Sequence, residues 1–126
     1  MERHVRLLRI LVSLWGGLAM LVGLSMLLLA AGAWAEFRQS LGTAVEFAAG
    51  LTTVVFAGIA AFALVWGGTH VWAGSLLRPH RPFGRILTLA LALVNLLVLP
   101  FGTGLGVYAL WVLLTDEGRR LFEPTR

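Results

Sequence analysis

Long apolar stretches separated by short polar segments set the pattern of this chain. The first two stretches cover residues 7–35 and 44–77, and each exceeds the roughly 20 residues that a helix needs to cross a bilayer. The polar segments EFRQSLG (36–42) and RPHRPFGR (78–85) follow them. A cleaved signal peptide is the alternative for the first stretch, but its apolar core would have only about 7–15 residues. The pattern therefore predicts two retained membrane helices.

The last apolar stretch, residues 83–114, is broken at Pro100-Phe101-Gly102-Thr103-Gly104. One interpretation is a single long helix with a kink. The other is a hairpin of two helices, in which Thr103 caps the second. Pro-x-Gly-x-Gly is more disruptive than a lone proline, so we favour the hairpin. Pro82 suits the first turn of the helix before it, where its missing N–H has no partner.

The sequence thus predicts an all-α fold, an integral membrane four-helix bundle with short loops. It forms a single transmembrane domain, residues 1–126, with helices at about 7–35, 44–77, 83–99 and 103–122. Arginine placement gives its orientation, because cytoplasmic loops are enriched in basic residues. With both termini cytoplasmic, only Arg38 lies outside. The nine cytoplasmic arginines are Arg3, Arg6, Arg9, Arg78, Arg81, Arg85, Arg119, Arg120 and Arg126.

A three-helix chain would instead export Arg119, Arg120 and Arg126. The four-helix interpretation is the better fit to the basic-residue rule, and it predicts a multi-pass protein of the bacterial inner membrane. Basic side chains beside apolar stretches reach lipid headgroups. We expect this role for Arg78, Arg81, Arg85, Arg119 and Arg120.

Composition supports a membrane setting and removes several chemistries. Hydrophobic residues make up 59% of the 126 residues and charged residues 13%, against about a quarter charged in soluble domains. The absence of cysteine excludes thiolate nucleophiles, iron–sulfur clusters and cysteine zinc sites. The net charge of +4 comes from arginines placed by membrane topology, so we predict no nucleic-acid partner. No acid/base pair, nucleophile triad or metal-ligand cluster can be assembled, and we expect no enzyme.

Two ionisable residues lie within the second apolar stretch. His70 follows Gly67 and Gly68, which would let a flat ring approach, so it is a candidate ligand for haem or chlorophyll. The alternative is that His70 hydrogen-bonds a neighbouring helix or a headgroup. Glu46 is either a proton or cation site or a carboxylate at the start of a helix, where the helix dipole favours it. Apart from this possible pigment, we predict no cofactor and no metal.

Polar and small residues predict helix packing. Asn95 and Thr88 lie on one face of the third helix, where an amide either bonds another helix or lines a pore. Small residues recur every four positions at Ala49, Thr53, Ala57 and Ala61, and Gly102 and Gly106 form a Gly-xxx-Gly pair. Such spacing lets helices approach closely, either within the chain or against a partner.

The segment from Asn95 through PFGT (100–103), LGVY (105–108) and LWVL (110–113) resembles a C-terminal signature of small bacterial inner-membrane proteins without assigned activity. The resemblance implies that setting and supports four helices, but implies no activity. We expect an accessory or scaffold subunit that packs against membrane partners or itself. The alternatives are an oligomeric channel or transporter using Asn95, Thr88, Glu46 or His70, and a haem- or pigment-binding subunit through His70.

Overall fold

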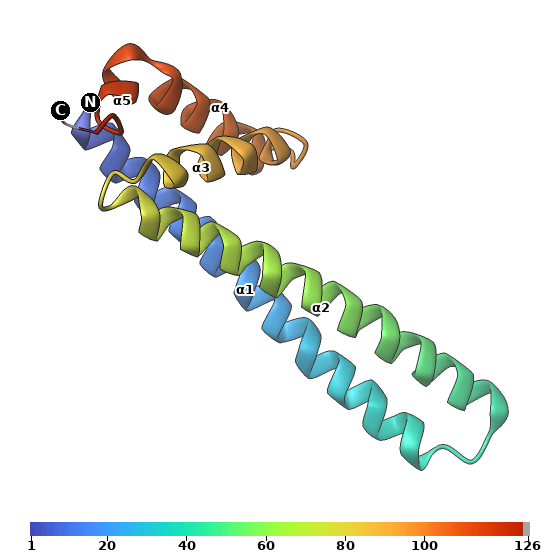
Figure 1. Cartoon of the computed structure of the whole chain (residues 1–126). Coiled ribbons are helices and arrows are strands. Elements are labelled where there is room, and N and C mark those ends of the chain that lie inside the picture. Colours follow the sequence, from blue (N-terminus) through green and yellow to red (C-terminus); the bar gives the residue numbers. More distant parts are fainter. Residues whose placement is uncertain (125–126) are drawn as a thin grey trace. The chain divides into compact units, whose positions relative to one another are not determined.

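The computed structural model of the chain describes residues 1–124, and every regular element within them is a helix, which confirms the all-α prediction (Figure 1). Arg126, counted above among the cytoplasmic arginines, lies outside the described residues. The helices are α1 (Glu2–Gln39), α2 (Thr43–Leu77), α3 (Pro82–Asn95), α4 (Phe101–Leu114) and α5 (Asp116–Arg120).

The first two helices are long and apolar enough to cross a membrane. α1 has 38 residues and α2 has 35, which correspond to about 57 and 52 Å at 1.5 Å per residue. Only 17% and 11% of the residues in their most apolar 18-residue windows are buried. A core helix of a soluble protein would be mostly buried, so these two helices instead present apolar side chains to their surroundings.

α3 and α4 are shorter, with 14 residues each, or about 21 Å against a hydrocarbon core of about 30 Å. α3 begins at Pro82 and ends at Asn95 rather than at residue 99. The last helix expected from the sequence, 103–122, is divided at Thr115, whose backbone is extended (φ −64°, ψ 148°). This extended residue separates α4 from the single turn of α5.

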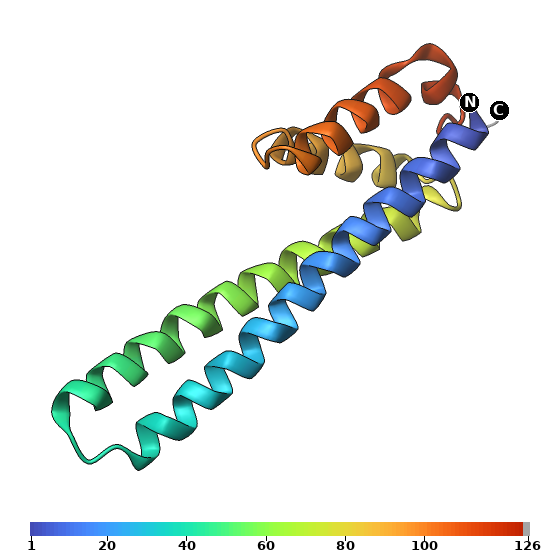
Figure 2. The same ribbon diagram turned by 180° about the vertical axis from the view of Figure 1, so that it is seen from behind.

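Residues 96–100 reverse the chain, so that α3 and α4 lie side by side in both views (Figures 1 and 2). Thr103 does not cap α4, which follows Pro100 without a side-chain cap. Instead the Thr103 hydroxyl donates to the carbonyl of Leu96 at 2.8 Å. Its backbone N–H donates to the carbonyl of Val98 at 3.0 Å. Thr103 therefore ties the start of α4 to the end of α3.

The chain divides into two compact units, and α1 and α2 contribute to both. Residues 17–68 form what we call the two-helix unit, in which α1 and α2 run alongside each other (Figure 2). A Cβ added to Gly23 would lie 2.9 Å from Cγ of Leu64, so the two helices approach closely there. Ala30, Ala49 and Ala60 are buried in this unit.

The second unit, here the terminal unit, contains residues 1–16 and the chain from Thr69 onward. Its core draws on the start of α1, the end of α2, α3 and α4. The buried apolar side chains are Val5, Leu8, Val12, Ala73, Leu77, Leu91, Ala92, Ala109, Val112, Leu113 and Phe122.

The start of α1 packs against α4 within the terminal unit. Nδ1 of His4 lies 3.2 Å from the Tyr108 hydroxyl. The His4 ring also meets the Trp111 ring edge-on, with centroids 5.3 Å apart. These contacts place the first turn of α1 on the last helix of the α3–α4 hairpin.

Candidate functional site

A buried histidine–asparagine pair lies in the terminal unit. His70 belongs to the last part of α2 and Asn95 is the final residue of α3; they are 0% and 2% exposed. Nδ2 of Asn95 lies 2.9 Å from Nε2 of His70. An amide nitrogen only donates, so Nε2 of His70 is the acceptor in this pair. The pair joins α2 to α3.

Haem or chlorophyll ligation by His70 would disturb this arrangement. Nε2 is already engaged by the Asn95 amide, and the ring has no exposed surface. A metal at Nε2 would have to displace Asn95 and open the core around both side chains. The geometry supports an interhelical hydrogen bond better than a ligand site.

The remaining polar atoms of this core differ in how they are satisfied. The Thr88 hydroxyl, which is buried, donates to the carbonyl of Gly84 at 2.8 Å and so bonds its own helix. Oδ1 of Asn95 is buried and has no hydrogen-bond partner among the described residues. Thr88 and Asn95 share a helix, as predicted, but they do not form one polar site.

The small residues that repeat every four positions on α2 differ in burial along the helix. Ala49 is buried and Thr53 is half-buried, whereas Ala57 and Ala61 are exposed. Ala60, not Ala61, is buried in the two-helix unit. A four-residue repeat drifts about 40° per step around a helix with 3.6 residues per turn. The drift carries the repeat from the buried face of α2 to the exposed one.

The glycine pair on α4 lies where α4 meets α3. A Cβ on Gly106 would be 2.6 Å from the carbonyl oxygen of Ala92. A Cβ on Gly102 would be 2.6 Å from Cβ of Val98 and 2.7 Å from the carbonyl oxygen of Asn95. Only a residue without a side chain fits at either position, so the pair allows the helices of the hairpin to approach closely.

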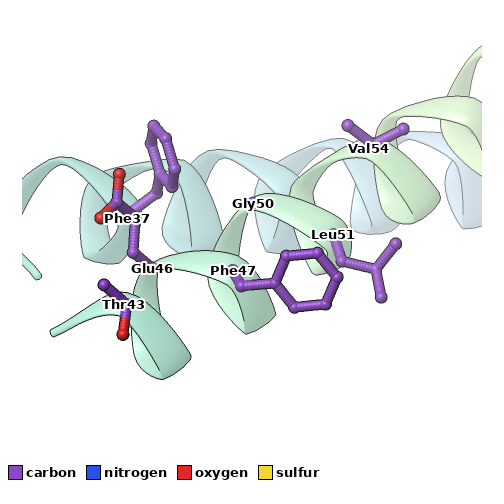
Figure 3. Close-up of a pocket in the computed structure, with 7 residues that line it drawn as sticks. All are labelled: Phe37, Thr43, Glu46, Phe47, Gly50, Leu51 and Val54. Carbon is purple, nitrogen blue, oxygen red and sulfur yellow. The ribbon is translucent and has the colours of Figure 1, made fainter.

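Glu46 lies in an open cavity of about 450 Å³ in the two-helix unit (Figure 3). Phe37 comes from α1, and the other lining residues come from α2: Thr43, Glu46, Phe47, Gly50, Leu51 and Val54. Glu46 is exposed and is the one ionisable residue among the seven. Glu46 is therefore the single charged group in a cavity that is otherwise mostly apolar.

The arginines singled out from the sequence divide into two groups. Arg78, Arg81, Arg119 and Arg120 are exposed. Arg85 is half-buried, and its Nε donates to the carbonyl of Leu113 at 3.0 Å. The last carbonyls of a helix have no partner within the helix, so Arg85 satisfies one at the end of α4. The contact that the structure gives Arg85 is thus with the protein, and its headgroup role stays a prediction.

Sequence reasoning missed the contact of His4 with Tyr108 and Trp111. His4 lies in α1, more than a hundred positions before Tyr108 and Trp111 in α4, so no periodicity in the chain connects them.

Comparisons with protein-family models, with curated proteins and with solved structures find no match to this chain. The resemblance of residues 95–113 to small inner-membrane proteins stays a prediction.

Proposed function

We propose that this chain is a multi-pass protein of the bacterial inner membrane that acts, without catalysis, as an accessory or scaffold subunit. The membrane placement is supported by α1 and α2, whose large apolar side chains are mostly unburied. Leu28, Phe62 and Val54 are 68%, 69% and 71% exposed. Water solvates such a surface poorly, and lipid solvates it well.

Both termini lie on the cytoplasmic side in this proposal. Two features of the terminal unit support a common side: α3 and α4 form a hairpin, and Met1 lines an open cavity together with residues 114–117. Because α3 and α4 are shorter than the hydrocarbon core, the hairpin enters the bilayer from the cytoplasm without crossing it fully. Leu97, Leu99 and Phe101 make its tip exposed and apolar.

The observation that carries the packing role is the exposed small-residue face of α2, formed by Ala57, Gly58 and Ala61. A Cβ on Gly58 would meet no atom within 4 Å. In a membrane, apolar burial gives little drive for helix association, and close backbone approach at small residues supplies it instead. The face is proposed as the contact for a helix of a partner or of a second copy.

The test is a pair of matched glycine substitutions. Gly58→Leu places a large side chain on the proposed face, and Gly32→Leu makes the same change on α1, where a Cβ also meets nothing within 4 Å. Native purification in mild detergent should give an assembly that Gly58→Leu breaks and Gly32→Leu preserves. A monomer that copurifies with no other protein would contradict the proposal.

The same purified sample separates the other functions considered from the sequence. A pigment subunit would absorb visible light and lose that absorbance in His70→Ala. A channel or transporter would give flux in liposomes that falls on replacement of Asn95, Thr88, Glu46 or His70. The buried, hydrogen-bonded state of His70, Asn95 and Thr88 gives either function less support than packing has.

A further inference from the structure

A small basic cavity lies in the terminal unit, between the first turns of α1 and the end of α2. Its volume is about 220 Å³. Val5 and Leu77, both buried, form its apolar base. Pockets for drug-sized ligands span about 300–1,000 Å³, so this cavity suits a small ion or a single headgroup.

Three arginines and one carboxylate line the cavity. Arg6 and Arg9 are three positions apart on α1, which places them on one face of the helix. Arg78 comes from the end of α2, and Glu2 is the single acidic residue. The three guanidinium groups outnumber the one carboxylate in the lining. The cavity thus has an uncompensated positive charge, presented by guanidinium groups whose planar donors match phosphate oxygens.

His80 completes the wall in an unusual backbone conformation. Its φ of 52° is left-handed, and no other non-glycine residue of the described chain has a positive φ. His80 N–H donates to the Leu77 carbonyl and Arg81 N–H to the Leu76 carbonyl, each at 3.3 Å. This is the helix-ending motif in which glycine is the usual left-handed residue.

A histidine at a position that suits glycine accepts backbone strain, and such strain is often found at functional sites. The His80 ring lines the cavity and packs against Phe122, with centroids 5.5 Å apart. The lining therefore holds an imidazole beside the three arginines.

We infer that this cavity binds a phosphate group through Arg6, Arg9, Arg78 and His80. The phosphate belongs either to an anionic lipid headgroup or to a free phosphate ion. A lipid source rests on the membrane placement proposed above, since the cavity lies where the first apolar stretch of α1 begins and basic pockets there meet headgroups. A free phosphate source does not depend on that placement.

The test compares three probes on the full chain in a non-ionic detergent: phosphatidylglycerol, phosphatidylcholine and inorganic phosphate at matched ionic strength. Binding is followed by native mass spectrometry and by the unfolding temperature. The paired change Arg6→Gln and Arg9→Gln should weaken binding about 25-fold, at about fivefold for each arginine. The control Arg3→Gln and Arg38→Gln removes equal charge at two residues that do not line the cavity and have no expected headgroup role, and it should leave binding nearly unchanged.

A second variant guards against a misfolded result. Glu2→Gln removes the only carboxylate of the cavity and should strengthen binding about fivefold, a gain that loss of structure cannot produce. Binding of phosphatidylglycerol alone identifies a headgroup, and binding of inorganic phosphate as well identifies a general phosphate site. Equal loss in the two double variants, or no binding of either anion, overturns the inference.

The outcome of the Gly58→Leu assembly test is independent of the outcome of the phosphate-binding test. A monomeric protein that binds phosphate would contradict only the packing role, and an assembly that binds no phosphate would contradict only the cavity.

Discussion

The side-chain amide of Asn95 donates to Nε2 of His70 across 2.9 Å, between two side chains that are almost fully buried. The bond joins the end of α3 to the last part of α2. Among apolar helices a buried hydrogen bond is directional where packing is not, so it sets the position of α3 along α2. The pair is thus a buried polar contact that positions α3 against α2 in the terminal unit.

Asn95→Leu should lower the free energy of unfolding by about 1–3 kcal/mol, because it leaves Nε2 of His70 buried without its donor. The double variant His70→Leu, Asn95→Leu should lose less than the sum of the single changes. Denaturant titration in mixed micelles, followed by circular dichroism, measures both. Strictly additive losses would show that the two side chains are not coupled.

Gly106→Ala should destabilise the α3–α4 hairpin by about 1–3 kcal/mol, since overpacking forces the backbone to shift. The new Cβ would lie 2.6 Å from the Ala92 carbonyl oxygen. Gly104→Ala is the control: its Cβ meets nothing within 4 Å, and alanine favours helix. Thermal unfolding should rank Gly106→Ala below the unchanged chain and Gly104→Ala at or above it. Equal effects would place the close approach elsewhere.

Thr103→Val should cost about 0.5–1.5 kcal/mol. It keeps the shape of the side chain but removes the hydroxyl that donates to the Leu96 carbonyl across the turn. The matched control is Thr52→Val, because the Thr52 hydroxyl makes a bond of the same length, 2.8 Å, only within its own helix. Hydrogen exchange of residues 96–104 should quicken in Thr103→Val and not in the control.

Arg85→Gln should lower the free energy of unfolding by about 1 kcal/mol. A hydrogen bond from a charged group contributes more than this when it is buried, and the partial exposure of Arg85 reduces its contribution. The loss is that of the bond from Nε to the Leu113 carbonyl. Arg119→Gln makes the same charge change at an exposed position and should have little effect. Thermal unfolding in detergent compares the two variants. If both unfold at the same temperature, Arg85 has no structural role.

The chain has no cysteine, so single cysteines report its orientation without background. In intact cells, a membrane-impermeant maleimide should label Gly42→Cys in the loop between α1 and α2. It should label Arg120→Cys only after the membrane is opened. Labelling of both in intact cells would contradict a cytoplasmic C-terminus.

The helix pattern followed from the sequence where local chemistry decides it. Pro82 marks the start of α3 and Pro100 the end of the reversal, because proline restricts the backbone of neighbouring residues. Gly102 and Gly104, which were expected in the turn, instead lie inside α4. The end of α3 at Asn95 did not follow, since it depends on the bonds that Thr103 makes from the next helix.

The candidate residues were identifiable, but their partners were not. His70 and Asn95 stood out as polar groups in apolar stretches, yet their pairing depends on how α2 and α3 are placed side by side, which spacing along one chain does not specify. Arg85 was predicted to contact headgroups because its actual partner, the Leu113 carbonyl, belongs to another helix and is not evident from the spacing along the chain.

The contact of His4 with Tyr108 spans 104 positions along the chain. During synthesis the first turn of α1 therefore leaves the ribosome long before its packing partner exists. The two-helix unit holds all its own contacts by residue 68, but the terminal unit stays open until α4 has been made. A nascent chain stopped before Tyr108 would keep its two long apolar helices, α1 and α2, but would lack the closed core of the terminal unit. Its exposed apolar surface would make it a substrate for proteases.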